Sequence, residues 1–166
     1  MDREFPEGYP VNLLTLIIED GAEDKAINVF RVCRTGKVNR DAFLSTFQDA
    51  QKKASNNTNE NTTIVNRDVA IFDTSKIDIG DFSTSCFDDL MPVRRIINNM
   101  QKSTPQQIIA KGITSPDCGL SMKTLNSKSK RSKRRNDPHV DWWIYKDATP
   151  EIYFKEYLEE KEADKQ

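Results

Sequence analysis

The stretch Asp137-Pro138-His139-Val140-Asp141-Trp142-Trp143-Ile144-Tyr145 carries the strongest local pattern in the chain. Read at the two-residue period of a β-strand, it places His139, Asp141 and Trp143 on one face and the apolar side chains between them on the other. It also holds the only histidine and both tryptophans of the protein. The stretch therefore predicts a strand with a core face and a face that carries an imidazole and a carboxylate, with one tryptophan in the core on each side.

The remaining segments predict helices and strands in an irregular order. Val11 to Asp20 is apolar on nearly every side and stops at Gly21, which indicates a buried helix with a left-handed cap. Thr149 followed by Pro150 is typical of a helix start. We expect helices at 11–20, 39–54, 88–100 and from 149 onward, strands at 27–33, 69–72, 107–113 and 139–145, and a long polar connection at 114–138. Because the strands and helices do not alternate regularly, we expect an α+β fold, a small mixed or antiparallel sheet of four or five strands with about four helices.

The length and composition predict one domain. A chain of 166 residues can bury a core without a metal or a disulfide, so residues 1–166 are expected to form a single domain with mobile loops near 55–63 and 123–137. No apolar stretch approaches the roughly 20 residues of a membrane helix. The first residues lack the basic and apolar regions of a signal peptide, and the expectation is a cytoplasmic protein that does not contact a membrane.

The three cysteines and the charges define further expectations. Cys33, Cys86 and Cys118 are widely spaced and form no C-x-x-C, so free thiols and no metal site are expected. The net charge is −1, but seven basic residues and no acid fall between Lys123 and Arg135. Such a basic loop favours an acidic partner, which its residues Lys130, Arg131, Lys133, Arg134 and Arg135 would contact.

Three short motifs occur in a characteristic order along the chain. Arg31 lies in the first expected strand, Phe82-Ser83-Thr84-Ser85 leads into a helix, and His139-x-Asp141 lies in the late strand. In these motifs the chain resembles the ADP-ribosyltransferase fold, whose arginine class has an arginine on the first strand, a Ser-Thr-Ser strand and a later Glu-x-Glu. The resemblance covers three short motifs within residues 29–145.

The resemblance implies NAD as the cofactor and assigns a role to each motif. Arg31 would contact the phosphates of NAD, and Ser83 and Ser85 would brace the nicotinamide site. Asp141 would steady the positive charge that develops on the ribose, and His139 stands where the family has its first acid. Since aspartate is one methylene shorter than glutamate, the expectation is a divergent NAD-binding domain that is either an active transferase or an inactive one.

Two other classes of function fit the same residues. Basic residues 128–135, interleaved with serines and followed by Trp142 and Trp143, are typical of a nucleic-acid-binding module. A small protein-binding protein, such as an accessory or inhibitor protein of a bacterium, phage or mobile element, would need no catalytic residues. In either case Arg31 would be a surface or ion-pair residue, the serines a strand end followed by a helix cap, and His139 a structural residue. The oligomeric state stays open.

Overall fold

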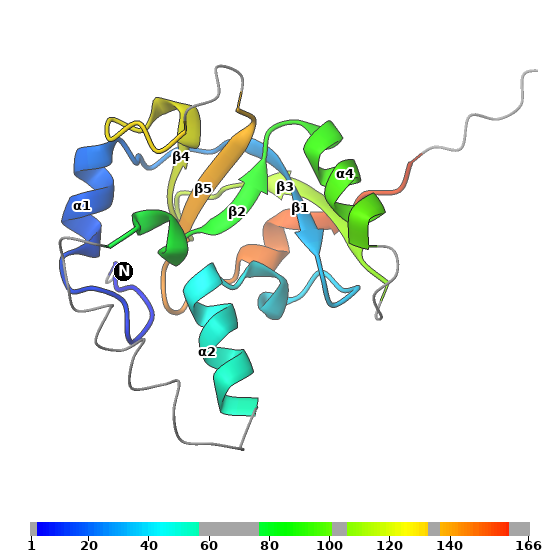
Figure 1. The fold of residues 1–166 in the computed structure, drawn as a ribbon, viewed down its shortest axis with the longest axis horizontal. Coiled ribbons are helices and arrows are strands. Elements are labelled where there is room, and N and C mark those ends of the chain that lie inside the picture. The colour runs from blue at the N-terminus through cyan, green and yellow to red at the C-terminus, as the bar shows by residue number, and fades with distance from the viewer. Residues whose placement is uncertain (1–2, 57–76, 101–105, 133–136, 160–166) are drawn as a thin grey trace, which may run out of the picture.

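The computed structural model describes residues 3–56, 77–100, 106–132 and 137–159 (Figure 1). These residues form one antiparallel sheet of six strands with three α-helices, which confirms the α+β class and adds at least one strand to the expected number. The helices are α1 (Leu13–Asp20), α2 (Thr46–Asn56) and α4 (Leu90–Met100). The strands are β1 (Asn28–Cys33), β2 (Thr84–Phe87), β3 (Ile108–Ile113), β4 (Gly119–Lys123), β5 (His139–Ile144) and β6 (Phe154–Glu156).

The strand order is β4-β5-β2-β1-β3-β6, so β5 lies inside the sheet between β4 and β2. Asp141 is paired with Ser85 on β2 and with Met122 on β4. The register between β1 and β2 is a single pair, Phe30 with Phe87, whereas β1 and β3 pair along their whole length. The two central strands β1 and β2 therefore diverge away from that pair and leave room for side chains between them.

The alternation predicted for β5 is confirmed. Trp142 and Trp143 are both fully buried, in separate hydrophobic clusters. Trp142 packs with Phe43 and Phe154, whereas Trp143 packs with residues of α1. Burying about 200 Å² of a tryptophan stabilises the fold by roughly 5 kcal/mol, so this strand organises both sides of the sheet.

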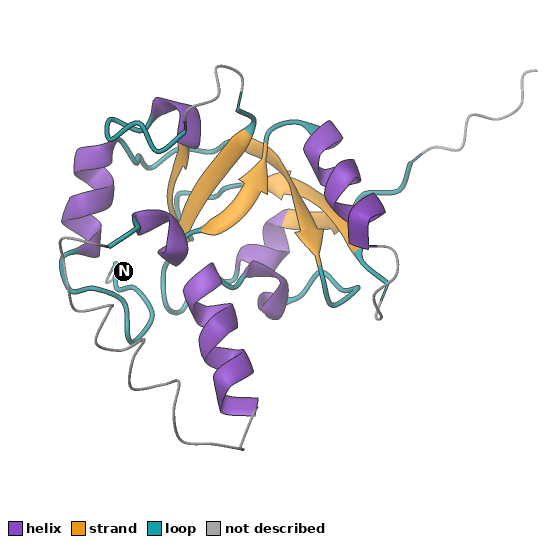
Figure 2. Cartoon of the chain, in the orientation of Figure 1, coloured by secondary structure: helices purple, strands orange, loops and turns teal. Residues whose placement is uncertain are grey.

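The helices lie around the sheet rather than in one layer. Figure 1 shows α1 at the side of β4 and β5 and α4 at the side of β1 and β3. Helix α1 ends as predicted: Gly21 adopts a φ of 117°, and its N–H bonds to the carbonyls of Ile17 and Ile18. Short 3-10 turns supply further cover, among them Arg40–Phe43 and Ile79–Phe82 (Figure 2).

The helix expected at 39–54 is divided in two. A 3-10 turn spans Arg40–Phe43, and α2 begins only at Thr46, after an extended residue at Leu44. Phe43 belongs to the cluster around Trp142, and Phe47 packs against the cluster around Trp143, so one continuous helix could not deliver both rings. Asn39, expected as the helix cap, makes no side-chain capping bond, and Ser45 caps α2 instead through reciprocal bonds with Gln48.

Two expectations for the second half of the chain were wrong. The polar connection at 114–138 contains β4, which pairs with β5 and supplies Leu120 and Met122 to the core. The final segment is a 3-10 turn, Pro150–Tyr153, followed by β6 instead of a helix. The backbone of β6 forms its hydrogen bonds with β3. Ile152 and Leu158 remain exposed.

Some expectations concern residues that the structure does not describe. The strand expected at 69–72 lies outside the described residues, as do most of the loop at 55–63 and the basic residues 133–135. Among the described residues, no helix is long and apolar enough to cross a membrane.

Candidate functional site

A cavity of about 180 Å³ lies where β1 and β2 diverge. Its wall includes Arg31 and Arg34 from the β1 segment, Ser83 and Ser85 from the β2 segment, and the start of α2. Three of the residues that the sequence assigned to NAD, Arg31, Ser83 and Ser85, thus line one cavity, which is named the Arg31 cavity below.

Arg31 reaches across the gap between the two strands. Its Nε donates to the carbonyl of Ala42 at 2.8 Å, and its Nη1 donates to the carbonyl of Ser85. Burial lowers the pKa of Arg31 below its usual value, and the charge of Arg34 lowers it further. No carboxylate forms an ion pair with Arg31 among the described residues, although the charge of Asp49 in the cavity wall favours the charged guanidinium from a longer distance.

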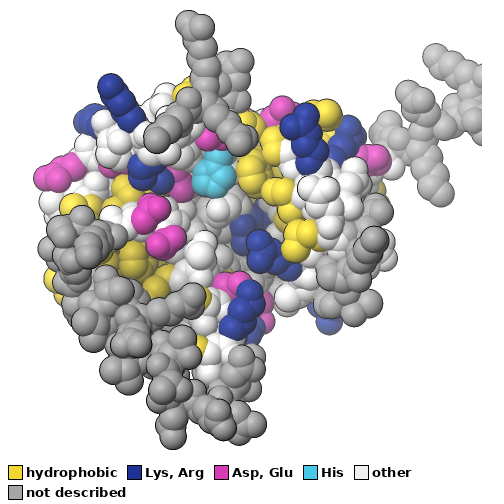
Figure 3. Space-filling model, viewed as in Figure 1, with side chains coloured by type: hydrophobic (Ala, Val, Ile, Leu, Met, Phe, Trp, Pro, Cys, Tyr) yellow, Lys and Arg dark blue, Asp and Glu magenta, His cyan; other side chains and the backbone are white. Residues whose placement is uncertain are grey.

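The two acids of the cavity wall have other partners. Asp41 pairs with Lys52 at 2.9 Å, and Asp49 pairs with Lys53 at 2.9 Å. Arg34 is exposed and forms no ion pair within the described part of the chain. Figure 3 shows Lys and Arg side chains gathered near a recess of this face, with the single histidine, in cyan, at its upper part. The balance of unpaired charge in the cavity is therefore positive.

Asp141 does not line the cavity but lies next to it, behind Ser83. Its side chain is 1% exposed, and Ser83 Oγ donates to Oδ1 at 2.6 Å. Oδ2 accepts from Thr124 Oγ1 at 2.7 Å and from Arg131 Nη2 at 2.8 Å. Asp141, which was expected to act on a bound sugar, is thus a buried group whose two carboxylate oxygens are bonded to Ser83, Thr124 and Arg131.

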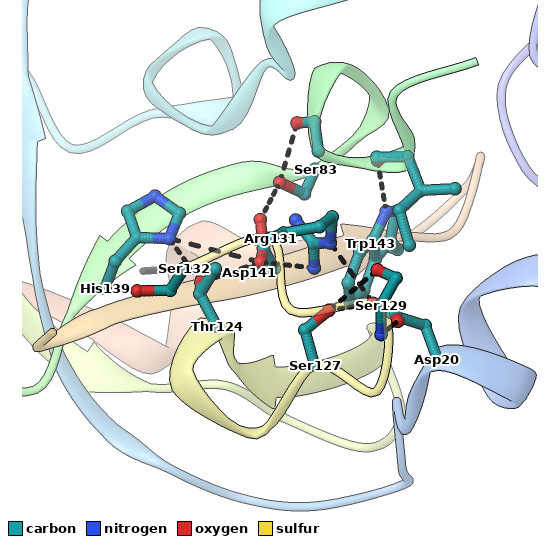
Figure 4. Close-up of polar contacts among 12 residues, drawn as sticks. Asp20, Ser83, Thr124, Ser127, Ser129, Arg131, Ser132, His139, Asp141 and Trp143 are labelled. Carbon is teal, nitrogen blue, oxygen red and sulfur yellow. Dashed lines mark hydrogen bonds and ion pairs between the residues drawn. The ribbon is translucent and has the colours of Figure 1, made fainter. Parts of the chain in front are cut away.

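His139 connects to Asp141 through Thr124. The His139 Nδ1 lies 2.6 Å from Thr124 Oγ1 and 4.0 Å from Asp141 Oδ2, so the hydroxyl stands between the ring and the carboxylate. The imidazole packs edge-on against Phe87 with ring centroids 5.4 Å apart, and its side chain is 25% exposed. His139 and Asp141 are thus part of one hydrogen-bonded chain (Figure 4).

Arg131 holds two aspartates together. Its Nη2 bonds to Asp141, and its Nε bonds to Asp20 Oδ2 at 3.1 Å, at the end of α1. Its guanidinium also lies 5.7 Å from the ring centroid of Trp143. We call these five residues, Asp20, Ser83, Thr124, Arg131 and Asp141, the Arg131 cluster.

Hydrogen bonds keep Asp20 ionised. Burial alone would raise the pKa of Asp20, but Ser127, Ser129 and Arg131 all donate to its carboxylate, and the net effect lowers the pKa. The opposing charges of Asp141 and Asp20 raise the pKa of Arg131 despite its burial. Asp20 and Arg131 therefore stay charged over a wide pH range.

The structure gives two residues of the expected partner-binding loop different environments. Lys130 is exposed, whereas Arg131 is 18% exposed and bonded within the molecule. Lys133, Arg134 and Arg135 lie outside the described residues. Contact of this loop with an acidic protein or a nucleic acid stays a prediction, but Arg131 has its carboxylate partners already. In the last described segment, Glu159 pairs with Arg94.

Sequence reasoning missed two members of the site, Thr124 and Asp20. Thr124 fell within a segment taken as a polar connection, and nothing in its neighbourhood marks it. Asp20 does carry a signal, because a carboxylate at the last residue of a helix is opposed by the helix dipole and calls for a specific partner. That partner is Arg131.

Comparison of the chain with protein-family models, with curated proteins and with solved structures gives no match. Among the described residues, no group of three or more His, Cys, Asp and Glu side chains is placed to hold a metal ion. The three cysteines are free and buried.

Proposed function

We propose that this domain binds NAD, with the phosphates of the dinucleotide in the Arg31 cavity, as a divergent ADP-ribosyltransferase-like domain. The observation that carries the proposal is the partly buried Arg31, which has no carboxylate partner among the described residues and lines a cavity together with Ser83 and Ser85. Buried charges in proteins are normally paired, and a guanidinium fork suits a phosphate. An anionic ligand supplies the missing counter-charge.

The surroundings support an anion in the same place. Arg34 adds a second cation, whereas Asp41 and Asp49 are engaged by lysines. The first residues of α2 also line the cavity, which brings the positive end of the helix dipole to it. Arg31 donates its Nε–H and one N–H of Nη1 to carbonyls, so the N–H groups of Nη2 and the second N–H of Nη1 remain for a phosphate oxygen.

The size of the cavity also bears on the ligand. Sites for whole drug-sized molecules measure about 300–1,000 Å³, so a cavity of about 180 Å³ holds one part of NAD. The diphosphate is the part that the arginines would bind. The rest of the molecule would extend over the adjoining sheet face, where Ser85, Phe87 and His139 are partly exposed.

Calorimetry with NAD tests the proposal on two matched arginines. Arg34→Ala removes an exposed arginine of the cavity, and Arg95→Ala removes an exposed arginine of α4 outside it. We expect Arg34→Ala to weaken NAD binding about tenfold, since a charge-assisted contact contributes roughly 1.5 kcal/mol, and Arg95→Ala to leave the affinity unchanged.

Further ligands identify which part of NAD is bound. ADP-ribose should compete with NAD, and nicotinamide alone should not, because only ADP-ribose carries the diphosphate. Equal affinities in the two arginine variants, or absence of binding at millimolar NAD, would refute the proposal.

A further inference from the structure

We propose that His139 is a general base, oriented by Thr124 and Asp141, which takes a proton from the water molecule that attacks the ribose of bound NAD. The domain is then an NAD hydrolase that yields ADP-ribose and nicotinamide. This inference rests on the proposed NAD binding and assigns the acceptor and the proton path of the same site.

The protons available in the hydrogen-bonded chain determine which nitrogen of a neutral imidazole is protonated. The Asp141 carboxylate, paired with Arg131, accepts hydrogen bonds only, and Thr124 has a single hydroxyl proton, which it donates to Asp141 Oδ2 at 2.7 Å. The contact of 2.6 Å between Thr124 Oγ1 and His139 Nδ1 must then be donated by the ring. The proton of a neutral His139 therefore lies on Nδ1, and Nε2 carries the free lone pair of a base.

The second ring nitrogen is free to meet a substrate. No described residue forms a hydrogen bond with His139 Nε2, and the side chain is 25% exposed. Figure 4 shows the second nitrogen turned away from Thr124 and Asp141. The edge-on contact with Phe87 fixes the ring from its other side. The base is thus held in one orientation before any ligand arrives.

The base lies within reach of a ligand in the Arg31 cavity. Ser85 lines that cavity and is the direct partner of Asp141 across β2 and β5. His139 is two residues from Asp141 on the same face, so it is a diagonal neighbour of Ser85, at about 7–8 Å. NAD is longer than this distance, so a ligand that leaves the cavity beside Ser85, on the face of the sheet that carries His139, would reach the imidazole.

The reaction needs no further reagent. The bond between ribose C1′ and the nicotinamide nitrogen breaks, its electron pair leaves with nicotinamide, and nicotinamide becomes neutral. The water oxygen bonds to C1′ and its proton passes to His139 Nε2, from which it returns to solvent. The imidazolium formed donates through Nδ1 to Thr124, which continues to donate to Asp141. Asp141 gains no proton and stabilises the positive ring through the hydroxyl, so Asp141 and Thr124 are positioning residues.

Of the charged groups near His139, Asp141 is the one that is connected to its ring, through the hydroxyl of Thr124. On the buried side, Arg131 forms ion pairs with both Asp141 and Asp20. Asp137 accepts a hydrogen bond from the backbone N–H of His139 at 2.9 Å. On the side of β2, Asp88 pairs with Lys123 at 3.0 Å, and the Asp88 N–H bonds to the carbonyl of Pro138.

The first test replaces the base. His139→Asn keeps an N–H that can donate to Thr124 but has no basic nitrogen at the position of Nε2. Nicotinamide release from NAD is measured by chromatography between pH 5 and 9, with NAD affinity measured by calorimetry on the same samples. We expect release at pH 8 to fall at least 100-fold and affinity to stay within about threefold. The variant, which has no imidazole at this position, should show a pH profile of release that differs from that of the wild type.

The second test separates positioning from folding. Thr124→Val removes the hydroxyl of the relay, Thr124→Ser restores it, and Thr114→Val removes a buried hydroxyl of another network as a control. Thermal unfolding of each variant gives its stability. We expect Thr124→Val to lower nicotinamide release at least tenfold, and Thr124→Ser to recover it. Thr114→Val should keep the wild-type rate at temperatures where it is folded.

The outcomes distinguish this inference from the proposed function. A wild type that binds NAD but releases no nicotinamide overturns the inference and leaves NAD binding in place. The same holds if His139→Asn retains the rate and pH profile of the wild type. A wild type that does not bind NAD overturns both proposals.

Discussion

Arg31 and Arg131 are both partly buried arginines beside the same sheet, and they differ in what neutralises them. Arg131 forms ion pairs with two aspartates that are 1% and 5% exposed and stacks near a buried tryptophan. Arg31 contacts two backbone carbonyls and no carboxylate among the described residues. Arg131 ties parts of the molecule together, whereas Arg31 lacks a carboxylate ion pair, which is the premise of the proposed NAD binding.

Ser83 joins the two regions. Its hydroxyl donates to Asp141 in the Arg131 cluster, and Ser83 also lines the Arg31 cavity. A change of charge in one region can therefore be felt in the other through a single hydroxyl. The comparison predicts large effects on stability in the Arg131 cluster and effects on ligand binding in the Arg31 cavity.

The largest expected effect is that of Arg131→Ala. Removing one partner of a buried ion pair leaves the other charge uncompensated, which destabilises a protein by roughly 3–5 kcal/mol. Here two carboxylates lose their cation, and unfolding in urea should show a loss of this size. Lys130→Ala, one residue earlier and exposed, serves as the control and should change stability by less than about 0.5 kcal/mol.

Arg31→Ala tests the same comparison between Arg31 and Arg131. It leaves two carbonyls without donors but no charge without a partner, so the expected loss is about 1–3 kcal/mol. If Arg31→Ala destabilises the protein more than Arg131→Ala does, the division into a structural arginine and a ligand-binding arginine is wrong.

The next effect is the stabilisation of the folded protein by NAD. At a concentration of 100 times Kd, a ligand that binds only the folded state contributes about 2.7 kcal/mol. For a protein of this size, each kcal/mol raises Tm by roughly 2–4 °C, and differential scanning fluorimetry detects such a shift. Arg34→Ala should reduce the shift at a fixed NAD concentration, while Arg95→Ala should not. A shift that is equal in all three proteins would place the ligand elsewhere.

A smaller effect is expected on acidification. Because the pKa of Asp20 is lower in the folded protein than its ordinary value of 3.8, the unfolded state binds more protons between the two values. The contribution of Asp20 to stability is therefore complete above pH 3.8 and is lost as the pH falls through the folded pKa. Urea midpoints between pH 7 and pH 3 should decline less steeply in Asp20→Asn than in the wild type. Parallel curves would show that Asp20 does not contribute.

The smallest effect concerns the thiols near Arg31, which test whether that cation activates its neighbours. Burial raises the pKa of Cys33 to about 11 and that of Cys86 to about 12, although the charge of Arg31 acts in the opposite direction. In Cys118→Ser, the two remaining thiols should react with a disulfide reagent at pH 8 at least 100-fold more slowly in the folded than in the urea-unfolded protein. Fast reaction of the folded protein would mean that the Arg31 region opens to solvent.

The sequence allowed the elements with a clear period to be predicted. The alternation in β5 and the Gly21 cap of α1 are properties of neighbouring residues, and both are confirmed. Strand β4 was not predicted because Gly119-Leu120-Ser121-Met122 contains no β-branched residue. Its position is decided by its pairing with β5. The final segment was expected to be helical because Thr149-Pro150 is typical of a helix start, whereas the free edge of β3 accepts Phe154–Glu156 as a strand.

The candidate site could be predicted only in part. Arg31, Ser83 and Ser85 were brought together by a resemblance in three motifs, and they do line one cavity. The burial of Asp141 and its ties to Thr124 and Arg131 could not be predicted, because they depend on how a loop folds back over β5. No local sequence pattern predicts such a contact, and a basic residue within a basic loop is expected at the surface.

The ion pair between Asp20 and Arg131 joins residues that are 111 positions apart, and this separation has a consequence for biosynthesis. At about 5–20 residues per second, a ribosome adds the arginine roughly 5–20 seconds after the aspartate. During this interval α1 has left or is leaving the exit tunnel with an acidic C-terminal end that lacks its cation, and β5, against which the helix packs, does not yet exist. The nascent chain thus exposes the apolar face of α1 for most of its synthesis, and this interval is when a chaperone would bind it.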